Sequence, residues 1–207
     1  MVNPSVYLAL FKDCMRKILL IALFISRVNI SSAQINARDD SAFQYHPSLL
    51  KEIDSTFFLE KKNDVEFQLW ISHPKMISTR LFILTQKDDK WVARLFEKNY
   101  KADTLVEITI NQWGLEKLWQ RLNDNKILSI PEEEDLKDKN GKEIDLLIHH
   151  GTRYSFVLTS TAANRSYSYY CPKLHLKEYK YVKTFARVFN IISLVFKHCG
   201  IKQNYIC

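Results

Sequence analysis

Alternating apolar and polar residues define the clearest element of the sequence. Between residues 65 and 72 every second side chain is apolar, and this period of two predicts a β-strand with one buried face. Branched and aromatic residues gathered between polar turns predict further strands, over residues 79–86, 91–97, 104–110, 144–149, 153–159 and 164–170. Short turns join the first four strands, which favours an antiparallel meander because parallel strands need long crossovers.

Two later stretches have the period of an amphipathic helix. In the first, residues 113–123, apolar residues recur at helical spacing and Asn111 is a candidate N-cap. The second, residues 177–198, is expected to be the longest helix. Its expected apolar stripe consists of Tyr179, Val182, Ala186, Phe189, Ile192 and Phe196. A short helix is also expected to open at Pro47.

These patterns together predict an α+β fold. We expect one antiparallel sheet of about six or seven strands, built from a meander of about four strands plus a C-terminal hairpin region. The two amphipathic helices, residues 113–123 and 177–198, are expected to cover one face of this sheet, because each has one apolar side to bury.

A short apolar run near the N-terminus has the pattern of a secretory signal peptide. Arg16 and Lys17 precede an unbroken apolar run over residues 18–25, and small residues follow up to Ala33. The run is too short for a membrane-spanning helix, which needs about 20 apolar residues. The pattern predicts cleavage between Ala33 and Gln34. An uncleaved anchor and a buried N-terminal helix are the alternatives.

Cleavage would define the mature protein and its compartment. Residues 1–33 would be removed, and residues 34–207 would form a single α+β domain with a loose leader at 35–46 and no membrane span. Met15, directly before the basic pair, is a candidate start of translation. The expected location is therefore the periplasm or the exterior of the cell.

Composition and charge narrow the class of partner. Hydrophobic residues make up 46% of the chain and aromatic residues 13%, which is typical of a folded protein rather than a disordered one. The net charge is +7, but residues 1–33 hold four basic residues and one acidic residue, so the remainder carries about +4. Basic and acidic residues alternate instead of forming a basic stripe, and no nucleic-acid partner is expected.

The four cysteines are Cys14, Cys171, Cys199 and Cys207. Removal of Cys14 with the signal peptide would leave three, so at least one would be unpaired or would pair between chains. Export permits a disulfide. The candidate pair is Cys171 with Cys199, which would tie the end of a strand to the end of the last helix; Cys199 with Cys207 is the alternative.

Motifs for cofactor or metal chemistry are absent from the sequence. With glycine only at positions 114, 141, 151 and 200, neither a phosphate-binding loop nor a serine-hydrolase elbow can be formed, and no cofactor is expected. His149, His150 and His175, with Asp145, are the only local cluster of potential metal ligands. Adjacent histidines on a strand point to opposite faces, so no metal site is expected. A cysteine nucleophile at Cys171 or Cys199, with a histidine base, is a weak alternative, and no catalytic residue is assigned.

The hairpin of residues 153–170 is the candidate binding site. It is rich in tyrosine and arginine, which are enriched at recognition hot spots and can also stack on sugar rings. The candidate residues are Arg153, Tyr154, Arg165, Tyr167 and Tyr169. The competing interpretation is that alternate tyrosines pack under the last helix while the others line a solvated face.

Several stretches resemble a group of small exported proteins of unknown function from Bacteroidetes-type bacteria. They are SSAQ at the end of the signal, EFQLWIS followed by RLFILTQKDDKWVARLFE, the helix WGLEKLWQRL, and RYSFVL with NRSYSYYCP before the last helix. The resemblance covers most of the mature chain and implies a setting in the periplasm or cell envelope. It implies no activity and no site residues.

The sequence therefore predicts an exported, non-enzymatic protein that binds an unknown protein or glycan partner. Two alternatives stay open: a small exported hydrolase whose site is assembled only in three dimensions, and a purely structural accessory domain. A deep pocket with a histidine or an isolated carboxylate would favour the hydrolase, and a shallow tyrosine–arginine surface would favour binding.

Overall fold

A computed structural model describes residues 45–57, 63–73, 78–144, 151–160 and 164–202 of the chain. All of these residues belong to one unit, Ser41–Cys207. The predicted signal peptide and most of the predicted leader lie outside the described residues, as does most of the strand predicted over 144–149. Cleavage near Ala33 and export therefore stay predictions.

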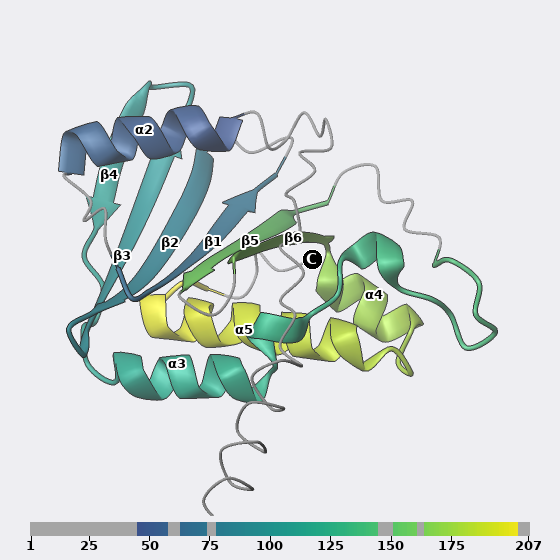
Figure 1. Cartoon of the computed structure of the whole chain (residues 1–207). Helices are drawn as coiled ribbons and strands as arrows, with labels where there is room; N and C mark the ends of the chain where they lie inside the picture. The colour runs from purple at the N-terminus through teal and green to yellow at the C-terminus, as the bar shows by residue number, and fades with distance from the viewer. Residues whose placement is uncertain (1–44, 58–62, 74–77, 145–150, 161–163, 203–207) are drawn as a thin grey trace, which may run out of the picture. The chain divides into compact units, whose positions relative to one another are not determined.

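Six strands form one antiparallel sheet (Figure 1). The strands are β1 (Val65–Ser72), β2 (Ser78–Lys87), β3 (Lys90–Asn99), β4 (Thr104–Ile108), β5 (Arg153–Ser160) and β6 (Asn164–Tyr170). Their order is β4-β3-β2-β1-β5-β6, so a meander of four strands is extended by the β5–β6 hairpin, which pairs with β1. The predicted α+β class is confirmed.

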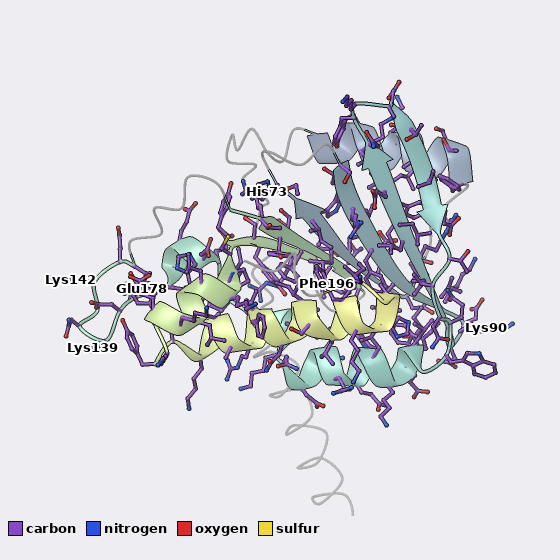
Figure 2. The ribbon with its side chains drawn as sticks, turned by 180° about the vertical axis from the view of Figure 1, so that it is seen from behind. His73, Lys90, Lys139, Lys142, Glu178 and Phe196 are labelled. Atoms are coloured by element: carbon purple, nitrogen blue, oxygen red, sulfur yellow. The ribbon has the colours of Figure 1, made fainter. Side chains whose placement is uncertain are left out.

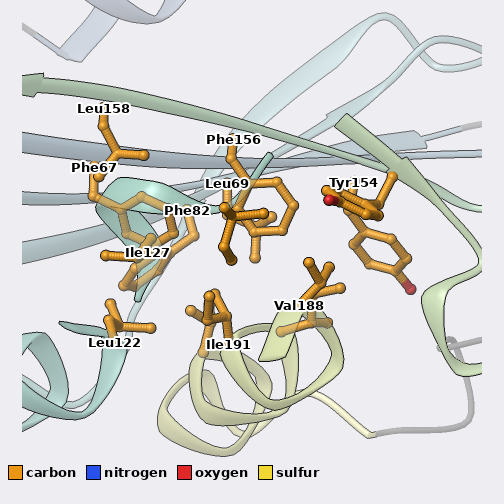
Figure 3. Close-up of a cluster of buried hydrophobic side chains, with 14 of the residues drawn as sticks. Phe67, Leu69, Phe82, Leu122, Ile127, Tyr154, Phe156, Leu158, Val188 and Ile191 are labelled. Carbon is orange, nitrogen blue, oxygen red and sulfur yellow. The ribbon is translucent and has the colours of Figure 1, made fainter. Parts of the chain in front are cut away.

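One face of the sheet, here called the α5 face, is covered by α3 (Leu115–Asp124) and α5 (Lys183–Cys199). The alternation of each strand sends one set of side chains to this face: Leu69, for example, lies opposite Phe82 on β2 and Phe156 on β5. Figure 3 shows these side chains meeting Leu122, Val188 and Ile191 from the helical layer. The expectation that two amphipathic helices cover one face is confirmed.

The opposite face, here called the α2 face, has a smaller apolar cluster. Helix α2 (Tyr45–Phe57) begins two residues before the predicted start at Pro47 and buries Leu49 and Ile53. These two residues pack against the strand residues Trp70, Leu81, Ile83 and Phe96. The sheet is therefore covered on both faces in the region of α2.

The C-terminal helical region differs from the prediction. The single helix expected over residues 177–198 is wrong: α4 (Pro172–Glu178) and α5 are separate helices. Cys171 has a left-handed φ of 37°, which turns the chain directly from β6 into α4, and the proline that follows occupies the first turn, where its missing N–H costs nothing. Helix α4 ends where the Val182 N–H bonds to the Tyr179 carbonyl instead of continuing the helix.

The buried stripe of α5 is also displaced from the predicted one. It consists of Phe185, Val188, Ile191, Ile192, Val195 and Phe196. Of the predicted stripe, only Ile192 and Phe196 are buried. Two short 3₁₀ helices, η1 (Ile127–Ser129) and η2 (Glu133–Asp135), precede β5. Among the described residues, no helix is both long and apolar enough to span a membrane.

Candidate functional site

The candidate tyrosines of the β5–β6 hairpin lie in the core. Tyr154 and Tyr169 are 0% exposed and Tyr167 is 3% exposed. Tyr154 faces Phe196 of α5 at a centroid distance of 6.4 Å, and Tyr169 meets Phe185 edge-on at 6.2 Å. The interpretation that alternate tyrosines pack under the last helix is therefore confirmed, and these three rings are not presented at the surface.

Their polar atoms hold a segment of the chain itself, residues 127–133, here called the edge segment. The Tyr167 hydroxyl donates to the Ile127 carbonyl at 3.0 Å, and the Tyr169 hydroxyl donates to the Pro131 carbonyl at 2.7 Å. The Arg165 guanidinium donates to the carbonyls of Leu128 and Ile130, the latter at 2.8 Å. Arg165, Tyr167 and Tyr169, which were candidates for binding a partner, thus bind the edge segment of their own chain.

Glu133 completes this contact at the outer edge of β6. Both of its carboxylate oxygens accept the Tyr170 backbone N–H, at 3.0 and 3.2 Å, so a donor on the edge strand is satisfied. Glu133 is 7% exposed. Burial raises the pKa of its carboxyl to about 8, against the opposing effects of the Tyr170 N–H and of the nearby Arg153.

Arg153 lies on the opposite face of the sheet from the buried tyrosines, because neighbouring residues of a strand alternate. It is 5% exposed and donates to the Ser168 hydroxyl at 2.9 Å and to the Tyr170 hydroxyl at 3.2 Å. Its guanidinium carbon also lies 5.0 Å from the centre of the Tyr170 ring. The five candidate residues therefore do not form one surface, and a binding role for them stays a prediction.

His175, on α4, is a buried aromatic residue. It is 2% exposed, stacks on Phe185 at 5.1 Å, and neither of its ring nitrogens has a hydrogen-bond partner among the described residues. Burial lowers the pKa of this histidine, while Glu178 has the opposite effect. His149, His150 and Asp145 lie outside the described residues. Within the described ranges, no three histidine, cysteine or acidic side chains come together as a metal site would require.

The predicted disulfide between Cys171 and Cys199 is wrong. Cys171 is disulfide-bonded, but Cys199 is a free thiol, so the partner of Cys171 lies outside the described residues. The reason is the length of α5, which carries Cys199 away from the end of β6. Helix α4 lies beside the N-terminal half of α5 (Figure 1), whereas Cys199 is the last residue of α5. A 17-residue helix is about 25 Å long, which no disulfide spans.

The free thiol of Cys199 is expected to be unreactive in the folded protein. Burial raises its pKa to about 12, so almost none of it is thiolate at pH 8. Iodoacetamide at pH 8, followed by peptide mass spectrometry, should leave Cys199 unmodified in the native protein and modify it fully in denaturant. Rapid modification of the native protein would contradict this and would revive the cysteine-nucleophile alternative.

Trp113 is a large exposed side chain that the apolar pattern of the sequence does not distinguish. It is 85% exposed, the highest value among the large hydrophobic residues that the structure describes. The helix predicted from residue 113 begins at Leu115 instead, so Trp113 lies in the loop that precedes it. This loop and the β2–β3 turn, where Lys90 lies, are at the same end of the sheet (Figures 1 and 2).

The loop of residues 111–114 is held by hydrogen bonds on both sides of Trp113. The Gln112 side chain pairs with the backbone of Ala93 on β3, donating to its carbonyl at 2.7 Å and accepting its N–H at 3.1 Å. The Asn111 carbonyl accepts a bond of 2.7 Å from His198 Nε2 on α5. The Asn111 side chain accepts the Trp113 N–H at 2.9 Å, and so it forms a local turn rather than the predicted cap of α3.

Gly114 completes the loop. Its φ of 73° is left-handed, a conformation that glycine adopts without the strain other residues incur. Its carbonyl accepts the N–H of Leu118, the first helical bond of α3. The chain therefore turns sharply into the helix, and Trp113 stays outside the apolar stripe that α3 buries.

No protein-family model matches the chain, and no curated protein matches it at a significant level. The resemblance to small exported proteins of Bacteroidetes-type bacteria therefore stays a prediction. Evidence on function comes from the geometry of the described residues.

Proposed function

We propose that the protein is an exported, non-enzymatic binding protein that holds a partner protein through Trp113. The observation that carries this proposal is the 85% exposure of Trp113 on a loop fixed by its neighbours. The loop is held by hydrogen bonds from Gln112 to β3 and from α5 to Asn111.

Tryptophan suits this role for a physical reason. Its ring offers a large apolar area with few rotatable bonds, and tryptophan is enriched among the residues that contribute most to binding energy. A loop that is already ordered loses little conformational entropy on binding, so more of the contact energy appears as affinity. The proposal therefore rests on the type of residue and on the order of its loop, which together suit a side chain that a partner covers.

Two features support export. The N-terminal pattern of Arg16, Lys17 and a short apolar run is typical of a signal peptide. Cys171 is disulfide-bonded, and disulfides persist mainly in oxidising compartments outside the cytoplasm. Both features agree with a periplasmic or secreted protein.

The hydrolase alternative receives less support from the described residues. Catalytic groups must be within reach of a substrate. Burial raises the pKa of the Glu133 carboxyl and lowers the pKa of the His175 imidazole, so it favours the neutral form of both groups. These two side chains are only 7% and 2% exposed. Both pack inside the unit, which favours a structural role for them.

Replacing Trp113 by alanine is expected to abolish capture of the partner without unfolding the protein. Removal of a binding hot spot costs about 2–4 kcal/mol, or on the order of 30- to 1000-fold in affinity. The melting temperature should hardly change, because the ring is in solvent. The measurement is quantitative co-purification of the full chain from the producing cells.

The matched control is Tyr181→Ala, which removes another exposed ring, 47% exposed, from the α4–α5 connection. Capture should be retained in this variant. Equal capture by wild type and Trp113→Ala would contradict the proposal, and a captured glycan in place of a protein would correct the class of partner.

A further inference from the structure

The two edge strands of the sheet are treated differently. At β6 the edge segment, which Arg165, Tyr167 and Tyr169 hold in place, supplies Glu133 as the acceptor of the outward Tyr170 N–H. The other edge strand is β4, which pairs only with β3. No described residue makes a backbone hydrogen bond to the outer side of β4. An unpaired edge of this kind is a template for a further strand.

The backbone groups on that outer side can be identified. The N–H and C=O of Ala93 point toward the β4 side, because the Gln112 side chain bonds to both. Alternate residues of β3 share this direction, so the residues of β4 opposite them form the hydrogen-bonded pairs with β3. These are Thr104, Val106 and Ile108. The N–H and C=O groups of Leu105 and Glu107 therefore point outward.

Two of the usual devices that block edge pairing, lysine and proline, are absent from β4. Val106 at its centre is 49% exposed. The acidic side chain within β4 is paired inside the chain: Glu107 binds Arg94 at 2.8 Å. Asp103, before the strand, shares Lys98 with Glu52, each at 2.7 Å. A second strand would thus meet no unpaired side-chain charge within β4 and no missing backbone donor.

We propose that β4 pairs antiparallel with β4 of a second copy of this chain, joining two sheets into one. The register is centred on Val106, so that Leu105 of each copy lies opposite Glu107 of the other. These outward-facing residues then exchange four backbone hydrogen bonds, as antiparallel geometry requires. The proposal is independent of the function assigned to Trp113.

The symmetry of this register is the reason for choosing a second copy as the occupant. A two-fold interface needs a self-complementary patch. Here the exposed Val106 meets its own equivalent, an apolar cross-strand pair, and no two like charges lie opposite each other. The five residues of β4 alone therefore supply a self-complementary patch without opposed like charges.

The test is the mass of the full chain in solution, measured by sedimentation over a range of concentrations. Wild type should form a dimer in a concentration-dependent manner. Glu107→Pro should be monomeric, because it removes an outward N–H that β3 does not use and adds a ring on the pairing edge. Glu107→Ala is the matched control: it loses the same ion pair to Arg94 but keeps the N–H, and it should still dimerise.

A cysteine at position 106 tests the register itself. Residues opposite each other in a non-hydrogen-bonded antiparallel pair have Cα atoms about 4.5 Å apart, within disulfide range. In a Cys199→Ser background, Val106→Cys should form a disulfide-linked dimer on mild oxidation, whereas Leu174→Cys on α4, 46% exposed, should not. A monomer at all concentrations, or a dimer that survives Glu107→Pro, would overturn the proposal.

Discussion

Replacing Tyr169 by alanine is expected to lower the free energy of unfolding by about 3–5 kcal/mol. The ring is fully buried between the sheet and Phe185, and its hydroxyl holds the Pro131 carbonyl of the edge segment. The substitution therefore leaves a cavity and also an unsatisfied acceptor. Urea unfolding of the wild type and the variant measures the difference.

Two comparisons separate these causes. Tyr169→Phe keeps the ring and should cost only about 1–3 kcal/mol, the price of leaving one buried polar group unpaired. Tyr181→Ala, on an exposed ring, should cost well under 1 kcal/mol. A loss in Tyr169→Ala no larger than that in Tyr181→Ala would mean that Tyr169 is not part of the core.

The second large effect is expected from Glu133. Its pKa is about 8 in the folded protein, against an ordinary carboxyl value of 4.5. Between these pH values the folded chain keeps a proton that the unfolded chain releases, so the folded state loses stability as the pH rises from 4.5 to 8. The loss contributed by this one group is on the order of a few kcal/mol.

Glu133→Gln removes the titrating group while keeping an oxygen that can accept the Tyr170 N–H. We expect the difference in unfolding free energy between pH 5 and pH 8 to shrink in this variant, and the variant to gain stability relative to wild type at pH 8. Glu132→Gln, on the exposed neighbouring side chain, is the control and should leave the difference unchanged. The same pH dependence in wild type and Glu133→Gln would contradict the assignment.

Strands were predictable where alternation is strict. The bounds of β1 and β6 agree with the predicted ranges, because the period of two is a local property of the chain. The end of β4 was less predictable: the strand stops at Ile108, where the Gln112 side chain takes over the pairing with Ala93. Because Gln112 makes these bonds with its side chain and not with its backbone, the alternation of apolar and polar residues does not indicate where β4 ends.

The buried side of the last helix was harder to predict from the sequence than the strands. Apolar residues surround much of α5, so more than one stripe at helical spacing can be drawn through the sequence. The choice of Phe185 and Val188 over Ala186 and Phe189 as the most buried positions depends on how the helix is rotated against the sheet. The break before α5 depends on the turn in which the Val182 N–H bonds to the Tyr179 carbonyl, and no local pattern indicates this turn.

The candidate site failed to form one surface for a related reason. Composition identified Arg165, Tyr167 and Tyr169 as able to recognise a partner, and they do bind peptide carbonyls. Those carbonyls belong to the same chain, 35 to 40 residues earlier in the sequence. Trp113 was missed because its exposure depends on the long-range bonds of Gln112 and His198.

The proposal that Trp113, and not the β5–β6 hairpin, recognises a partner can be tested by photo-crosslinking in the producing cells. A photoreactive phenylalanine would be placed at position 113 in one variant and at the exposed Asn164 of the hairpin in another. We expect a discrete adduct with a second protein from position 113 and none from position 164. An adduct from position 164 with none from position 113 would contradict the claim.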